Sequence, residues 1–137
     1  MPISKAVYGR LRDASSVDAL IAGRVYVGAA PTSAIHPYMV VQQVSGSPLY
    51  AYVGNSGTAR ASIQVDAYAQ TPAAATAMRD AIKATLEDYR GTMGDDSLFV
   101  KRCALREERQ SARAPTDASD VWTHRRSLDF VFLYTEN

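Results

Sequence analysis

The sequence predicts an α+β fold in which one main helix packs on a largely antiparallel sheet. Residues 61–70 alternate apolar and polar side chains with a period of two, as a half-buried strand does. Residues 72–90 repeat apolar side chains at intervals of three and four, which is typical of an amphipathic helix. Residues 127–134 alternate again, so a strand closes the chain. A chain of 137 residues fits a single domain, residues 1–137, with a core of its own.

Shorter elements precede this strand and helix. Residues 3–14 place apolar side chains on one helical face. Ser15 offers an N-cap for a second short helix, which Gly23 ends. Residues 24–27 predict a short strand, and residues 38–45 predict a longer one that leads into a loop rich in Gly, Ser and Pro.

The main helix and the C-terminal strands have recognisable boundaries. Thr71 is suited to cap the helix and Pro72 to its first position, where the missing N–H costs nothing. Gly91 is expected to end the helix. Residues 98–109 and 121–134 predict two long strands joined by a polar loop. The second strand is longer than a domain of this size requires, so part of this long C-terminal β-hairpin is expected to project from the body.

Composition and charge narrow the function classes. Fifteen basic and fourteen acidic residues give a net charge of +1, which argues against a general nucleic-acid binder. Twelve of the basic residues are Arg, a side chain favoured at interfaces, although a GC-rich genome produces the same bias. The single cysteine, Cys103, provides no disulfide framework and is expected to be buried. There is no signal peptide and no apolar run of membrane-spanning length, so we expect a cytoplasmic protein or part of an assembly built there.

A reaction centre would need a nucleophile, a base and an orienting group that converge. His36 in a loop and His124 on a strand have no partner at metal-ligand spacing. Residues 95–96 are adjacent aspartates typical of a turn, and residues 107–108 are glutamates that point to opposite faces of a strand. The sequence therefore predicts no enzyme activity, no metal site and no cofactor.

Cationic residues concentrate on the last two predicted strands and the loop between them. They are Lys101, Arg102, Arg106, Arg109, Arg113, Arg125 and Arg126. Such a stripe could bind DNA phosphates, but five interleaved acidic residues leave a net charge of about +2. Cross-strand pairing of arginines with carboxylates is the favoured interpretation. Arg109, Arg113, Arg125 and Arg126 are retained as candidate interface residues.

Aromatic residues mark a second candidate interface. The loop at residues 46–57 carries four apolar or aromatic side chains, which are Leu49, Tyr50, Tyr52 and Val53. A solvated turn does not require so many, and tyrosine is favoured in interface cores, so we expect this loop to contact a partner. The alternative is that these side chains fold back on the sheet. Trp122, the only tryptophan, opens the final strand, where core packing and interface anchoring are equally expected.

The order of these segments resembles the tail completion or tail terminator family of tailed bacteriophages. The segments that carry the resemblance are the N-terminal helical pair, Arg24-Val-Tyr, Pro37-Tyr-Met-Val-Val-Gln-Gln-Val-Ser-Gly, Ile63-Gln-Val-Asp-Ala-Tyr-Ala, the Ala-rich helix ending Tyr89-Arg-Gly, and Ser127-Leu-Asp-Phe-Val-Phe. Each segment is common by itself, whereas their order and spacing are fairly specific. The resemblance runs from about residue 4 to residue 134.

The resemblance implies a structural virion protein. Subunits of that family form a ring, commonly a hexamer, at the head-proximal end of the tail tube. The ring ends tube polymerisation and joins the tail to the head-completion or connector proteins. DNA would pass through the lumen without specific binding, and assembly would take place in the host cytoplasm. The family has no catalytic residues to carry over, and no single contact residue can be transferred.

Two other functions remain open at this point. An accessory nucleic-acid- or protein-binding module would use the Arg-rich C-terminal hairpin. A chaperone-like cytosolic interaction protein would be a stable monomer or dimer, whereas the family resemblance implies a closed assembly.

Overall fold

The computed structural model describes the backbone of residues 3–21, 23–30, 37–51, 54–94, 98–113 and 123–135, and their side chains except at 47–51, 54–56 and 113. This part of the chain contains three helices, α1 (Ile3–Asp13), α2 (Ser15–Ile21) and α3 (Pro72–Leu86). It also contains six strands, β1 (Val25–Val27), β2 (Tyr38–Ala51), β3 (Gly54–Ala69), β4 (Gly91–Met93), β5 (Leu98–Arg113) and β6 (Thr123–Thr135).

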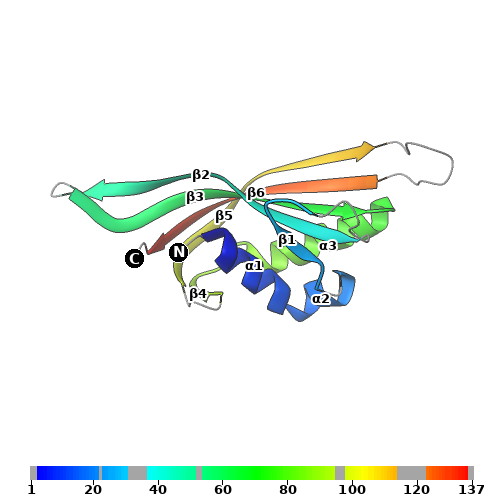
Figure 1. The fold of residues 1–137 in the computed structure, drawn as a ribbon, viewed down its shortest axis with the longest axis horizontal. Helices are drawn as coiled ribbons and strands as arrows, with labels where there is room; N and C mark the ends of the chain where they lie inside the picture. Colours follow the sequence, from blue (N-terminus) through cyan, green and yellow to red (C-terminus); the bar gives the residue numbers. More distant parts are fainter. Residues whose placement is uncertain are drawn as a thin grey trace.

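The six strands form one sheet in the order β1-β2-β3-β6-β5-β4. Neighbouring strands are antiparallel, except that β1 runs parallel to β2. The three helices lie together on one face of this sheet, which we call the covered face; the opposite face is the open face (Figure 1). The predicted α+β fold with a largely antiparallel sheet is therefore confirmed.

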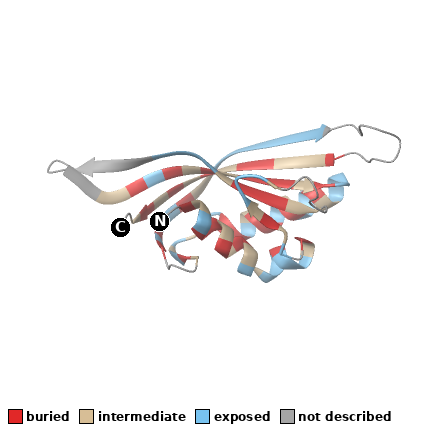
Figure 2. Cartoon of the chain, in the orientation of Figure 1, coloured by how far each residue is buried: buried red, intermediate tan, exposed pale blue. Residues whose placement is uncertain are grey.

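The core lies between the helices and the covered face. Every second residue of β3 and β6 is buried there, as the predicted alternation requires: Ile63, Val65, Ala67, Ala69, Leu128, Phe130, Phe132 and Tyr134. Apolar side chains of all three helices belong to the same buried core, including the completely buried Leu11, Ile21 and Ile82. Figure 2 shows the buried residues along the inner sides of the helices and the central strands. Cys103 is also buried on β5, as predicted.

The main helix begins as predicted but ends earlier. Thr71 is the N-cap, and its hydroxyl oxygen accepts a hydrogen bond from the Ala74 N–H at 3.1 Å. The helix ends at Leu86 instead of residue 90, so the expected end at Gly91 is wrong. Asp88 makes the left-handed turn with a φ of 60°, and its N–H donates to the Cys103 carbonyl on β5. This bond to the sheet turns the chain away from the helix before the apolar pattern ends.

Two further boundaries differ from the sequence prediction. Gly91–Met93 forms β4 and pairs with the start of β5, a strand too short for any periodicity to reveal. Residues 46–57, predicted as a loop, instead continue the pairing of β2 with β3 as far as Ala51 and Gly54. Backbone pairing tolerates the Gly- and Ser-rich composition that suggested a loop.

Two long hairpins project from opposite ends of the sheet (Figure 1). The first arm is the distal part of β2 and β3, residues 46–51 and 54–61, and the second arm is the distal part of β5 and β6, residues 107–113 and 123–129. The projection predicted for the C-terminal hairpin is confirmed. β5 continues to residue 113, four residues beyond its predicted end.

Breaks in the strand register bend both hairpins. The register shifts between Gln43 and Ser45 on β2, and again between Leu105 and Glu107 on β5, so Val44 and Arg106 are extra residues without a paired partner. Bulges of this kind bend a strand and increase its twist. Val40 and Asp66 on the open face are buried, although no helix covers them.

Candidate interface surfaces

The second arm carries arginines that are held by neighbouring side chains. Arg109 donates two hydrogen bonds to the Asp129 carboxylate across the strands, at 2.9 and 3.3 Å, and lies 3.3 Å from a Glu107 oxygen. These contacts raise the pKa of the Arg109 guanidinium, chiefly through the hydrogen bond to Asp129. Arg126 donates to the side-chain oxygen of Gln110 on the paired strand. The cross-strand pairing favoured from the sequence is thus present at Arg109.

Arg125 belongs to a buried polar cluster on the open face. Its guanidinium lies 3.2 Å from a carboxylate oxygen of Asp66, whose side chain is only 3% exposed. Gln64 donates to both oxygens of this carboxylate, at 2.9 and 3.1 Å, and the hydroxyl of Ser127 donates to Oδ1, the oxygen that Arg125 does not contact. The Arg125 guanidinium also lies 5.8 Å from the centre of the Tyr68 ring, within the range of a cation–π contact. Three donors therefore compensate the burial of Asp66.

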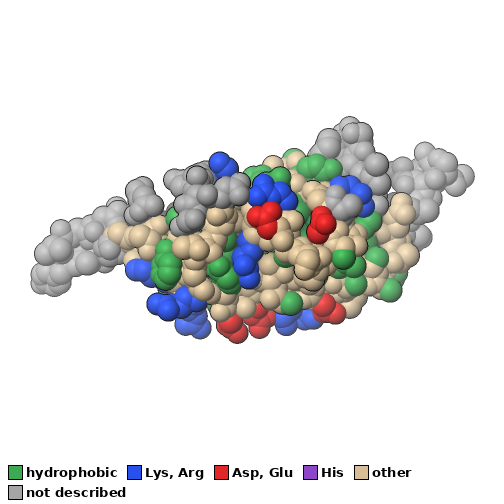
Figure 3. All heavy atoms as spheres, turned by 90° about the horizontal axis from the view of Figure 1, so that it is seen from below, with side chains coloured by type: hydrophobic (Ala, Val, Ile, Leu, Met, Phe, Trp, Pro, Cys, Tyr) green, Lys and Arg blue, Asp and Glu red, His purple; other side chains and the backbone are tan. Residues whose placement is uncertain are grey.

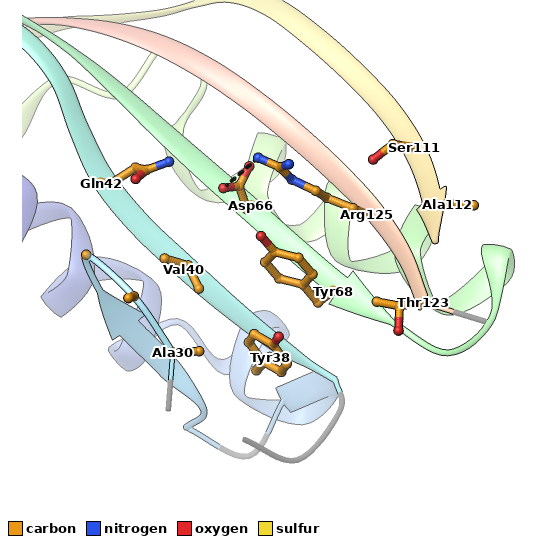
Figure 4. Close-up of a pocket in the computed structure, with 12 residues that line it drawn as sticks. Ala30, Tyr38, Val40, Gln42, Asp66, Tyr68, Ser111, Ala112, Thr123 and Arg125 are labelled. Atoms are coloured by element: carbon orange, nitrogen blue, oxygen red, sulfur yellow. Dashed lines mark ion pairs between the residues drawn. The ribbon is translucent and has the colours of Figure 1, made fainter. Parts of the chain in front are cut away.

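This cluster forms one wall of a hollow of about 510 Å³ on the open face. Figure 4 shows the side chains of Asp66 and Arg125 pointing toward one another across the paired strands, with Tyr68 and Tyr38 beside them. The two tyrosine rings are stacked with their centres 4.9 Å apart. The second arm also contributes Ser111, Ala112 and Thr123 to the lining. The hollow combines aromatic faces with a neutralised charge pair, which favours contact with a protein segment over catalysis.

On the covered face, charged side chains connect the helical layer to the second arm. Arg79 of α3 donates to both oxygens of Glu108 on β5, at 2.5 and 2.9 Å. This pairing raises the pKa of Arg79 and lowers that of Glu108, in each case mainly through the shared hydrogen bonds. Glu107 bonds to Arg109 on the open face, so the two glutamates do point to opposite faces as predicted. Figure 3 shows the helical side, where acidic and basic side chains are interspersed.

Several candidates cannot be placed. Leu49 and Tyr50 lie on the backbone of β2 and Arg113 on that of β5, but their side chains are outside the described residues. The residues that lie wholly outside the described part are Tyr52, Val53, Trp122, His36, Asp95 and Asp96.

The titratable residues that can be placed do not converge on a reaction centre. His124 is half-buried on β6, and burial raises the pKa of the Cys103 thiol to about 12. Among the described residues, no group of three His, Cys, Asp or Glu side chains could hold a metal ion. No helix in the described ranges is long and apolar enough to cross a membrane.

Sequence reasoning missed the burial of Asp66. The only signal was an aspartate in the middle of an otherwise regular strand pattern. It also missed Arg60, which lies on the open face of β3 opposite Leu133 and is exposed.

The fold and these surfaces are typical of a structural subunit. Helices cover one face of a sheet that extends two arms, and several charged side chains of the sheet form ion pairs within the subunit. Comparison with known proteins defines the class further. A model of the family described as "Tail completion protein gp17" matches residues 5–135. The chain belongs to this family and is a structural protein of the phage tail and hence of the virion.

Solved structures show the same fold. A chain in the structure described as "Virion of native gene transfer agent (GTA) particle" has a TM-score of 0.75 and 16% sequence identity, over 97% of this chain and 94% of that chain. At this identity the similarity shows the fold alone. No curated protein matches the sequence.

Proposed function

We propose that this protein forms a closed ring, a hexamer, at the head-proximal end of the tail tube. The whole chain, residues 1–137, would act as one tail-terminator domain. The ring would stop polymerisation of the tube and join the tail to the head-completion or connector proteins. Its partners would be other copies of itself, the tail tube protein and the connector. Membership of the tail completion family supports this proposal.

The position of the two arms is the observation that carries the ring. They project from opposite ends of the sheet, so each subunit presents two different surfaces (Figure 1). A contact between two different surfaces is heterologous, and repetition of such a contact closes into a ring if the rotation between neighbours permits. A terminator has to close, because an open filament would continue the tube that it is meant to stop.

Unpaired strand edges on the two sides of the sheet support the same proposal. Among the described residues, β1 pairs with β2 only at Met39–Val41, and β4 pairs with β5 only at Leu98–Val100. Within the described ranges, most of the outer edge of each long strand, β2 on one side and β5 on the other, therefore has no strand paired with it. Open edges pair readily with another chain. Pairing of strand edges between neighbouring subunits would occupy the outer edges of both β2 and β5.

The aromatic tip of the first arm is proposed to reach a neighbouring subunit or the tail tube. Leu49, Tyr50, Tyr52 and Val53 would supply apolar contact there, and Trp122 would do so on the second arm. Arg113 and the paired Arg109, Arg125 and Arg126 would lie at the same contacts. Replacing Tyr50 and Tyr52 with Ser should leave the subunit folded and impair assembly. Loss of the circular dichroism signal of the fold in this double variant would instead assign both rings to the core.

The protein is proposed to act without catalysis, metal or cofactor. Assembly would take place in the host cytoplasm, and the finished ring would surround the DNA path through the neck of the virion. The alternative of an accessory module that binds through the C-terminal hairpin is less well supported. Two of the arginines it would use, Arg109 and Arg125, are already paired with carboxylates.

The biological test is a phage genome from which this gene is deleted. Electron micrographs of the lysate should show full heads beside unjoined tails of irregular or excessive length. Normal tails firmly attached to heads would contradict the terminator function and leave an accessory binding protein as the better account.

A further inference from the structure

We propose that the open face binds the sugar–phosphate backbone of double-stranded DNA through Arg60, Arg102 and Arg106. This inference goes beyond ring formation and does not depend on it, because the residues lie on one subunit. The contact would be independent of base sequence, since only phosphates would be bound.

Strand register places the three arginines near one another. Arg60 on β3 lies opposite Leu133 on β6, and Leu133 lies opposite Arg102 on β5, so the two arginines flank one leucine across three adjacent strands. Neighbouring strands are about 4.8 Å apart, which puts the backbones of Arg60 and Arg102 about 10 Å apart. Arg106 is the extra residue of the bulge on the same strand as Arg102. All three side chains are exposed.

These arginines differ from Arg109 and Arg125 in having no carboxylate partner. Arg109 and Arg125 are paired with Asp129 and Asp66. Within the described part of the chain, Arg60, Arg102 and Arg106 form no ion pair or hydrogen bond through their side chains. Their positive charge is therefore available to a ligand. Lys101 donates to the hydroxyl of Thr58 and adds a further charge that no described carboxylate balances.

Arg60 and Arg106 share a hollow of about 450 Å³ on the open face. Its other lining residues are Ser45, Ser62 and Val131. Arg106 also lines an adjoining hollow with Glu107 and Asp129, but both of those carboxylates are paired with Arg109. Guanidinium groups bind phosphate through two parallel hydrogen bonds, and serine hydroxyls commonly donate to phosphate oxygens. The composition of this hollow is therefore complementary to a phosphodiester.

The same composition makes an acidic protein a poorer occupant. Protein interfaces are built around apolar and aromatic anchors in a desolvated centre. This hollow offers a single valine. The two stacked tyrosines of the open face, Tyr38 and Tyr68, line the separate hollow beside Arg125.

Three phosphate contacts give weak binding with a definite dependence on salt. The slope of the logarithm of the binding constant against the logarithm of the salt concentration is about −0.9 for each phosphate neutralised, so about −2.7 is expected for three. Weak contact of this kind suits a protein with a net charge of only +1, because it would allow DNA to move past the face.

Fluorescence anisotropy with labelled 30-base-pair duplexes of two unrelated sequences tests the proposal. The triple variant R60Q/R102Q/R106Q should lose at least tenfold in affinity at low salt and most of the salt slope. The control R12Q/R79Q/K83Q removes the same net charge from helices α1 and α3, and should keep the slope. Sizing of each variant separates loss of DNA binding from loss of assembly.

Two results would overturn the proposal. Equal loss of affinity in both triple variants would show that net charge, not this face, determines binding. Binding of polyglutamate as tight as that of the duplex, abolished in R60Q/R102Q/R106Q, would assign the face to an acidic protein partner instead.

Discussion

The two faces of the sheet are made by the same strands but use their side chains in opposite ways. On the covered face, Ile63, Val65 and Phe130 are completely buried under the helices. On the open face, Gln64, Asp66 and Asp129 alternate with them and form a network of hydrogen bonds and ion pairs. The covered face supplies the stability of the fold through apolar burial. The open face is a polar surface. Its charged side chains that have no partner within the subunit can be paired only by another molecule.

The largest effect is expected on the covered face. Phe130→Ala removes a fully buried ring from the centre of the core and should lower the free energy of unfolding by about 3–5 kcal/mol. Urea denaturation followed by circular dichroism measures this loss. Val131→Ala, one residue along but half-buried on the open face, is the matched control and should cost much less. If the two variants lost similar free energies of unfolding, the covered face would not be the main source of stability.

An intermediate effect is expected for the buried acid of the open face. Asp66→Asn keeps the shape of the side chain but removes the charge that pairs with Arg125, in a position that is 3% exposed. The groups that donate to the Asp66 carboxylate would then lack a full hydrogen-bond acceptor, which should lower the free energy of unfolding by about 1–3 kcal/mol. Asp129→Asn breaks the more exposed pair with Arg109 and should cost less than Asp66→Asn, because solvent screens the pair. The contrast fails if both variants unfold at the same urea concentration.

The smallest effect is expected where the helical layer meets the second arm. Hydrogen bonds from Arg79 lower the pKa of Glu108 in the folded protein, so this pair stabilises the fold above the ordinary carboxyl pKa. The stabilisation is lost as the pH falls through the lowered pKa. Both side chains are partly exposed, so Glu108→Gln should cost under about 1 kcal/mol at neutral pH.

Thermal unfolding of the Glu108→Gln variant and the parent protein at several pH values checks this sign. The difference in stability should be constant near neutral pH and should shrink in acid. A difference that grows as the pH falls would contradict the role given to this pair.

The regular parts of the fold could be predicted because they repeat. The alternation in β3 and β6 and the spacing of apolar residues in α3 each extend over several turns or residue pairs, and both identified the covered face correctly. The N-cap at Thr71 could also be predicted, because its hydrogen bond joins residues that are close in the sequence. The end of α3 could not be predicted in this way, because it is set by the hydrogen bond from the Asp88 N–H to the Cys103 carbonyl, which lies on a strand distant in the sequence.

The candidate surfaces were only partly predictable for the same reason. Sequence showed an excess of arginine and its interleaving with acids, but not which arginine meets which carboxylate. The partner of Arg125 is Asp66 on β3, far away in the sequence. The unpaired state of Arg60 is a property of the folded sheet and has no sequence signature.

The central claim is that two dissimilar arms join copies of this chain into a closed ring. The most direct test is the mass of the purified protein by light scattering, followed by negative-stain imaging. The ring account predicts one species of about six times 14.9 kDa with a central hole and sixfold symmetry, either free in solution or on addition of tail tubes. A monomer or dimer that remains so in the presence of tail tubes would contradict it.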